Sequence, residues 1–221
     1  FLEKMPVLAE VERMIGRFEP IPMDRQRIRE EEGVHPELFC PDLEAAEEMY
    51  RRIIEIKQAG DSSGGTVEVV ATGLPPGVGE PVFKKLDGEL GRMLSIGAVK
   101  AVEIGVGVAA KQMTGSQCND QMYVDENKRV CFRSNNAGGI TGGLTTGQPI
   151  VVRLTVKPTP TIGKDQQTID KVSLENRVLK AVTRRDPTIV ARVWPVAEAF
   201  TALILLDHLV MHLGYQALWR R

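Results

Sequence analysis

Apolar residues recur at helical spacing between Asp42 and Gly60. The residues on this face are Leu43, Ala46, Met49, Ile53 and Ile56. Aspartate is a preferred N-cap residue, and glycine commonly follows the last turn of a helix. The pattern therefore predicts a helix over residues 43–59 that Asp42 caps and that ends at Gly60.

Three further stretches carry helical patterns. Residues 6–17 and 80–93 are amphipathic, and a longer region opens after Asp186-Pro187, where Pro195 is expected to end or kink the first turns. The apolar stretch 196–213 is interrupted by Glu198, Asp207, His208 and His212. It is therefore predicted to be a buried helix and not a membrane span.

Alternating and continuous apolar runs predict strands at 66–73, 99–104 and 150–156. Residues 121–132 predict a hairpin with its turn at 125–127. Helices and strands do not alternate strictly, so a parallel βαβ repeat is disfavoured. The expected class is an α+β domain, layered as a β-α-β sandwich, with antiparallel strands and a long C-terminal helical region.

Composition limits the classes of partner. The chain has 221 residues, enough for one sizeable domain, and a formal net charge of −1. A neutral chain has no overall attraction to nucleic acid or to an anionic membrane, so any anion site must be local. Three cysteines without a CxxC pair predict reduced thiols in a cytosolic setting and no zinc site.

Local chemistry concentrates in residues 134–161, SNNAGGITGGLTTGQPIVVRLTVKPTPT. Paired glycines leave the backbone unshielded, so its amides could approach an anion. A strand follows, and then Lys157 with Thr159 and Thr161. The spacing is neither a Walker loop nor GxGxxG. Two alternatives remain open from the residues alone: a cradle for a phosphate-bearing ligand, or a set of tight turns.

Several blocks of the chain resemble the chorismate synthase family, in the family's order. They are GDSSGG at 60–65, GLPPGVGEPVF at 73–83, LSIGAVKAVEIG at 94–105, SNNAGGITGG at 134–143, KPTPTI at 157–162 and RRDP at 184–187. The likeness implies a single domain over residues 1–221. It would comprise a charged lead-in at 1–39, a family-like core at 40–213 and a tail at 214–221.

Two blocks of the family have no counterpart here: a Gly-Glu-Ser-His-Gly run and a Ser-Ser-Ala-Arg-Glu-Thr-like run. The chain begins with Phe1, where the family is already well under way. It therefore resembles the C-terminal portion of a chorismate synthase. We expect this chain alone to be inactive.

The resemblance implies a lyase that eliminates phosphate from 5-enolpyruvylshikimate 3-phosphate and forms chorismate, the last step of the shikimate pathway. The family requires reduced FMN, with NADPH as a reductant in bifunctional members, and is typically a cytoplasmic homotetramer. Partners would be the small-molecule substrate, without nucleic acid or membrane. The competing hypotheses are a non-catalytic fragment that binds flavin or phosphate, and a purely structural domain.

The resemblance also implies a cofactor site. Residues 157–161 (Lys157, Pro158, Thr159, Pro160 and Thr161) would lie on the FMN, with Gly142 and the Gly97-Ala98 pair. The family often has Asn where Gly97 stands, so only backbone contact is expected there. The alternative roles are a strand-end lysine in an exit loop, a glycine needed for backbone geometry at position 142, and a helix C-cap at Gly97.

Arg184 and Asp186 match family residues in the active site. Arg184 would bind substrate and flavin, and Asp186 would help to move a proton near the flavin. Arg185 stands where the family frequently has His, so it adds a fixed charge and removes a titratable group. The alternative role for Asp186, before Pro187, is a helix N-cap.

Three other polar groups receive mostly structural interpretations. Asp61-Ser62 predicts a helix-to-strand turn with an Asx cap. His208 and His212 are spaced like metal ligands but lack HExxH, which favours a helix stripe. Arg133 could order the glycine-rich run or reach a ligand, and the sequence leaves both open.

Overall fold

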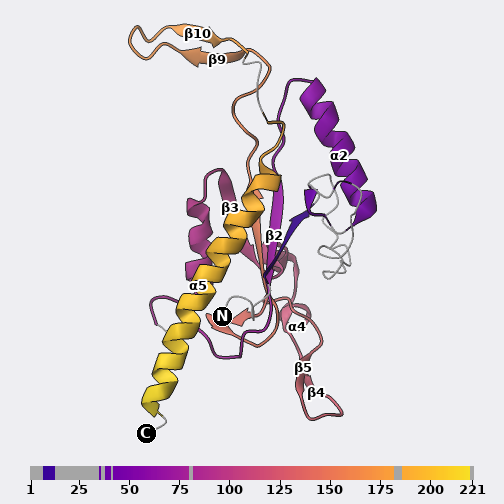
Figure 1. The fold of residues 1–221 in the computed structure, drawn as a ribbon, viewed down its shortest axis with the longest axis vertical. Helices are drawn as coiled ribbons and strands as arrows, with labels where there is room; N and C mark the ends of the chain where they lie inside the picture. Colours follow the sequence, from indigo (N-terminus) through magenta and orange to yellow (C-terminus); the bar gives the residue numbers. More distant parts are fainter. Residues whose placement is uncertain are drawn as a thin grey trace.

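The computed structural model describes residues 7–12, 35, 38–40, 42–79, 82–181 and 186–219. Its centre is a four-stranded antiparallel sheet with the strand order β1-β2-β8-β3. These strands are β1 (Val7–Glu12), β2 (Gly65–Ala71), β3 (Val99–Ile104) and β8 (Ile150–Val156). The predicted α+β class with antiparallel strands and a C-terminal helix is confirmed (Figure 1).

One face of this sheet carries the hydrophobic core. Alternate residues of β2 and β8, among them Val67, Val69, Val152 and Leu154, are fully buried there. The core also includes residues of three helical segments: Leu86, Leu90, Met93, Val193, Ala197 and Leu205. Burial of a side chain of this size contributes about 1.5–3 kcal/mol, so the period-two pattern of the strands fixes which face the helices cover.

The other face of the sheet holds a charged pair. Arg153 on β8 lies opposite Glu68 on β2, and its Nη2 is 2.7 Å from Glu68 Oε2. The Glu68 side chain is only 1% exposed. The arginine therefore neutralises a carboxylate that would be costly to bury alone.

Helix α2 (Leu43–Gln58) is confirmed with its predicted cap. The Asp42 carboxylate accepts a hydrogen bond from the Ala45 amide at 2.9 Å. Ala59 forms the C-cap, and Gly60 follows in the left-handed region with φ +69°. Of the predicted apolar face, Ala46 and Met49 are buried together with Ala45, whereas Ile53 and Ile56 are half-buried and Leu43 is exposed.

Helix α5 (Val190–Trp219) runs along the sheet and packs against β1, β2 and α3 (Figure 1). The helix continues through Pro195, so the expectation that this proline ends it is wrong. Its buried face includes His208 and His212, which confirms the helix-stripe interpretation. By length and composition alone α5 could also cross a membrane, a property that a core helix shares.

The opposite face of α5 is apolar and exposed. Val196, Leu203 and Val210 follow one another at intervals of seven residues, and Leu213 continues the stripe. Their side chains are 49%, 64%, 58% and 47% exposed, respectively. This stripe is the kind of surface that further polypeptide covers.

Two helix predictions are corrected by the structure. The described part of 6–17 is strand β1, which pairs with β2 along its whole length. Within 80–93, α3 covers only Leu86–Gly91, and the 3₁₀ helix η3 continues over Arg92–Ser95. Partner strands in the first case and two glycines in the second outweigh the amphipathic pattern.

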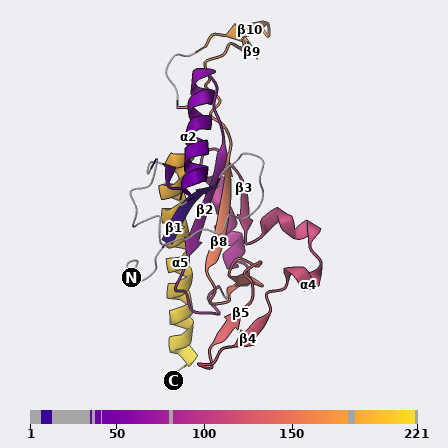
Figure 2. The ribbon, with the colours of Figure 1, turned by 90° about the vertical axis from the view of Figure 1, so that its right-hand side faces the viewer.

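The remaining elements are short and peripheral. The predicted hairpin is confirmed as β4 (Met122–Val124) and β5 (Val130–Phe132). A second hairpin, β9 (Gln166–Ile169) and β10 (Asn176–Leu179), projects from the opposite end of the molecule (Figure 1). The helical turns η4 (Gly107–Gln112) and α4 (Gly115–Cys118) extend away from α5 (Figure 2). The two-residue strands are β6 (Ile140–Thr141) and β7 (Leu144–Thr145).

Candidate functional site

Two of the predicted cofactor segments meet where β8 ends. The Lys157 amide donates a hydrogen bond to the Ala98 carbonyl at 2.9 Å. Ala98 lies at the start of β3 with φ +70°, a conformation that costs a non-glycine residue about 1–2 kcal/mol. The turn Gly97-Ala98 is therefore held against Lys157 in a strained conformation, which is common at functional sites.

Asp186 belongs to the same group. Its carbonyl accepts a hydrogen bond from the Thr159 hydroxyl at 3.2 Å. The structure thus brings together Gly97-Ala98, the segment 157–161 and Asp186, although the sequence separates them by up to 89 positions (186 − 97).

The Lys157 side chain is exposed, and no described carboxylate forms an ion pair with it. Pro158, Pro160 and Thr161 beside it are also exposed. A Cβ built on Gly97 would meet no atom within 4 Å. The Lys157 ammonium group thus has no described ion-pair partner, and exposed hydroxyl and backbone groups lie beside it. Such a set of groups suits an anionic ligand.

Asp186 is not a helix N-cap. Helix α5 begins four residues later, at Val190, and the Val190 amide donates to the Thr188 hydroxyl at 3.3 Å. The Asp186 carboxylate instead pairs with Arg192 on the first turn of α5, with Nη1 to Oδ2 at 2.7 Å and Nη2 to Oδ1 at 3.4 Å. The capping alternative is therefore wrong, and Arg192 is a contact that the sequence did not suggest.

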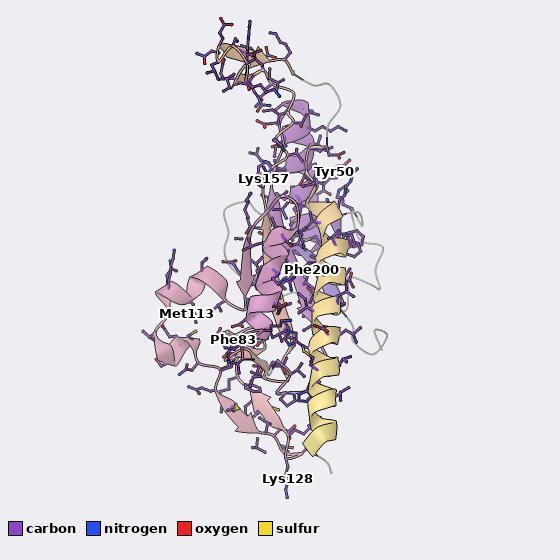
Figure 3. All side chains as sticks on the ribbon, turned by 90° about the vertical axis from the view of Figure 1, so that its left-hand side faces the viewer. Tyr50, Phe83, Met113, Lys128, Lys157 and Phe200 are labelled. Atoms are coloured by element: carbon purple, nitrogen blue, oxygen red, sulfur yellow. The ribbon has the colours of Figure 1, made fainter. Side chains whose placement is uncertain are left out.

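Gly142 lies at the opposite end of β8. The run 134–147 is tied to the start of that strand, where the Val151 amide donates to the Gly138 carbonyl at 3.2 Å. Seven residues of strand span about 20 Å between this point and Lys157. In Figure 3, Lys157 lies in the upper half of the molecule, and Phe83 and Lys128 lie in the lower half. One chain therefore does not combine the glycine-rich run and Lys157 in a single cradle.

A lysine is already bound at the Gly142 end. Lys85 donates from its ammonium group to the Gly142 carbonyl at 2.6 Å. Arg133, which was predicted to lie beside this run, stacks over the Tyr123 ring, with its guanidinium carbon 5.2 Å from the ring centroid. Both positive groups thus contact the protein itself.

Asp120 orders the glycine-rich run. Its carboxylate accepts from the Ser134 hydroxyl at 2.6 Å and from the amides of Asn136 and Ala137 at 2.7 and 2.9 Å. Partial burial acts to raise the pKa of Asp120, but the three hydrogen bonds outweigh it and lower the pKa below its usual value. The polar start of the run therefore has a structural explanation.

Arg184 and Arg185 lie outside the described residues, so their predicted roles stay predictions. The three cysteines, Cys40, Cys118 and Cys131, form no disulfide with one another. Within the described part of the chain, no group of three or more potential ligands could hold a metal ion.

The sequence profile of the chorismate synthase family matches residues 3–210. The chain belongs to the chorismate synthase family. It is 50% identical to the chorismate synthase of Methanococcoides burtonii over 172 residues, which are 77% of this chain and 47% of that protein. It is 49% identical to the chorismate synthase of Methanocaldococcus jannaschii over 174 residues, which are 78% of this chain and 46% of that protein.

The fold comparison agrees. A solved structure described as a crystal structure of chorismate synthase matches with a TM-score of 0.70 at 32% sequence identity. The match covers 96% of this chain and 59% of that chain. This chain therefore spans about half the length of the chorismate synthases that it matches.

One loop of the candidate site was not predicted from the sequence. Gly60–Gly65, expected only to connect a helix to a strand, contacts both the segment 157–161 and the residue after Asp186. This loop is one of the family-like blocks of the sequence. The residues that it contacts lie about 100 positions away along the chain, and no local sequence pattern reveals contacts at that range.

Proposed function

We propose that this protein serves the chorismate synthase reaction, the elimination of phosphate from 5-enolpyruvylshikimate 3-phosphate to give chorismate, with reduced FMN. The observation that carries the proposal is the meeting of Gly97-Ala98, residues 157–161 and Asp186 at one end of the sheet. Membership of the family supports it independently.

Lys157 is proposed to hold the FMN phosphate. Its ammonium group is exposed and pairs with no described carboxylate, so it can neutralise an anion without breaking an existing bond. Thr159 and Thr161 supply hydroxyls on the same segment, and the Gly97-Ala98 turn supplies backbone. The reduced flavin, when bound, would supply the electron that eases loss of phosphate, and the chain would supply position and charge.

Asp186 is the proposed group for proton movement, and Arg184 the proposed contact to substrate and flavin. The Arg192 guanidinium fixes the direction of the Asp186 carboxylate through two contacts. A carboxylate held in this way presents its remaining lone pairs in one orientation, which proton transfer requires.

The chain provides too few cations for its proposed ligands. The substrate carries two carboxylates and a phosphate, and FMN adds another phosphate. Within the proposed site the described residues offer Lys157 and also Arg192, whose charge Asp186 already pairs. Arg184 and Arg185 are proposed to lie there too, whereas Lys85 and Arg133 lie at the other end of β8. The match with this chain covers about half of a family-length chorismate synthase. We therefore propose that turnover also needs the part of such a protein that lies outside the match.

The assembly and setting are proposed by the same resemblance. The proposed form is a cytoplasmic homotetramer of family-length chains. NADPH would be the reductant of FMN only if the protein were bifunctional. Gly142 is left out of the proposed FMN contacts within one chain, because it lies at the far end of β8.

Anaerobic phosphate release from 5-enolpyruvylshikimate 3-phosphate with reduced FMN tests the proposal. The 221-residue chain would be compared with the same chain completed to family length by the unmatched part of the Methanococcoides burtonii relative. We expect release only from the completed protein. Release by neither, with FMN still bound, would support the non-catalytic alternative. Robust release by the chain alone would contradict the charge argument.

A further inference from the structure

The loop Gly60–Gly65 makes more contacts than a connection between a helix and a strand needs. The Ser62 hydroxyl donates to the Thr159 carbonyl at 2.7 Å, across 97 positions of sequence. The Ser63 amide donates to the Pro187 carbonyl at 2.8 Å. Two adjacent serines thus bind the two segments that the proposed site requires.

A third hydrogen bond closes this arrangement. The Thr159 hydroxyl donates to the Asp186 carbonyl at 3.2 Å, so the two segments also contact each other. The loop, the segment 157–161 and residues 186–187 therefore form a closed ring of contacts. A shift of any one member would break at least two hydrogen bonds.

The glycines of the loop explain why it fits there. A Cβ on Gly64 would lie 2.3 Å from the Val156 carbonyl oxygen, and one on Gly65 would lie 2.8 Å from Val190 Cγ2. Real Cβ atoms do not approach other atoms so closely. The loop therefore packs tightly between the end of β8 and the start of α5. Lys157 directly follows β8, and Asp186 lies shortly before α5.

Asp61 extends the contact beyond residue 161. Its carboxylate binds the Lys164 ammonium at 2.6 Å and accepts from the Ser62 amide at 2.9 Å. The Lys164 hydrogen bond is the main cause that lowers the pKa of Asp61, with the Ser62 amide second. Both ends of the segment 157–164 are thus tied to the same loop.

We propose that Gly60–Gly65 is the positioning element of the site and that Ser62 is its positioning residue. The inference rests on the proposed function, because it takes residues 157–161 as the FMN segment. Ser62 sets the place of Thr159, and through Thr159 the separation between Lys157 and Asp186. Neither serine is required to touch the ligand.

The segment has few other hydrogen bonds: the Lys157 amide binds the Ala98 carbonyl, the Thr159 hydroxyl binds the Asp186 carbonyl, and the Pro160 carbonyl accepts from the Gln166 side chain. Pro158 and Pro160 have no amide hydrogen to donate to a neighbouring strand, and β8 has ended at Val156. Without the Ser62 hydroxyl the Thr159 carbonyl loses its partner. The segment would then sample several positions and hold a phosphate less well.

FMN affinity, measured by quenching of flavin fluorescence, tests the inference on the intact chain. We expect Ser62→Ala to weaken binding about 5- to 10-fold, the loss of one hydrogen bond. Ser62→Thr keeps the hydroxyl and should stay within about twofold of the parent. The matched control is Ser173→Ala, in the turn between β9 and β10. This variant should have the same FMN affinity as the parent. Equal affinity of Ser62→Ala and the parent would overturn the inference, and so would a loss that threonine does not restore.

Amide hydrogen exchange separates this inference from the proposed function. If the parent binds no FMN at millimolar concentration, the cofactor assignment fails for this chain. The positioning role of Ser62 is then tested by the amide exchange rates of residues 159 and 161–163. Faster exchange there in Ser62→Ala, restored in Ser62→Thr, would support the positioning role. Unchanged exchange in Ser62→Ala would overturn it.

Discussion

Similar residues lie near the two ends of β8, but their polar groups differ in whether they already have partners within the protein. Each end joins glycine-rich backbone to a lysine and to threonines. At the Gly142 end, Lys85 binds the Gly142 carbonyl and Asp120 occupies the amides of Asn136 and Ala137. At the other end, Lys157 is exposed and pairs with no described carboxylate.

Individual glycines near the two ends differ in the space around them. A Cβ on Gly105 would lie 2.1 Å from the Asn136 carbonyl oxygen, and one on Gly139 would lie 2.5 Å from that of Pro149. A Cβ on Gly97 would meet nothing within 4 Å. Gly105 and Gly139 thus permit close packing of backbone, as Gly64 does at the second end, whereas Gly97 and Gly142 lie in open space. The comparison shows that each glycine of such a motif must be judged by the atoms that already contact it.

The largest expected effect belongs to Asp186→Asn in the family-length protein. Loss of a proton-transfer group lowers turnover about 10²- to 10⁴-fold. The Asp186–Arg192 pair is largely exposed, and such pairs contribute about 0–1 kcal/mol, so thermal stability should change little. The measurements are kcat for chorismate formation and the unfolding midpoint.

Asp186→Ala and Arg192→Lys complete this test. The alanine variant should be as inactive as the asparagine variant and nearly as stable, because Asp186 does not cap α5. Arg192→Lys keeps one charge but loses the second contact, so it should retain part of the activity. Full activity of Asp186→Asn would end the catalytic assignment.

Gly105→Ala should strongly destabilise the fold. Gly105 has φ +60°, and its Cβ would clash with the Asn136 carbonyl. Left-handed strain alone costs about 1–2 kcal/mol, and the clash adds to it, so we expect a loss of about 3 kcal/mol or more. Gly97→Ala is the matched control and should change the free energy of unfolding by less than about 0.5 kcal/mol. Equal losses in both variants would contradict the distinction between these two glycines.

Asp120→Asn tests the glycine-rich run through its pH dependence. The pKa of Asp120 is lowered in the folded protein, so its contribution to stability is complete above the unfolded value of about 3.9 and is lost as the pH falls through the folded value. At pH 7 the variant should be less stable by about 1–3 kcal/mol, the cost of weakened hydrogen bonds to a charged group. The difference between the two proteins should shrink below about pH 4. A difference that is independent of pH would contradict this role.

The smallest effect is expected from Gly97→Asn. The position has room for a side chain, and the family often has Asn there. Stability should change by less than about 0.5 kcal/mol. An added amide contact would tighten FMN binding by up to about fivefold, measured by titration. Weaker binding would show that Gly97 faces the ligand too closely for any side chain.

Much of the fold could be predicted from short-range patterns. The strand 150–156 and the helix 43–59 were predicted almost to the residue, because continuous apolar runs and a capped amphipathic helix are local signals. Strand β1 was missed because residues 6–17 also suit a helix, and only pairing with β2 decides between the two. The hairpin β9–β10 is polar and exposed, so it carries no hydrophobic pattern.

The candidate site was predictable in its residues and not in its arrangement. Family-like blocks indicated Lys157, Asp186 and Gly142 separately, but their spacing along the chain could not show that β8 separates Gly142 from the other two. The contact of Ser62 with Thr159 spans 97 positions, and no periodicity encodes it. Long-range contacts depend on the whole sheet, and the sequence specifies them only through the fold.

The most direct measurement is a paired FMN titration of Lys157→Ala and Lys85→Ala at low and high salt. Lys157→Ala should weaken binding by roughly 1.5–3 kcal/mol, the value of a charge-assisted contact, and high salt should reduce the difference. Lys85→Ala should leave the affinity unchanged, because that ammonium group binds the Gly142 carbonyl. Equal titration curves for Lys157→Ala and the parent, or a larger loss in Lys85→Ala, would contradict the assignment of the cofactor to the Lys157 end of β8.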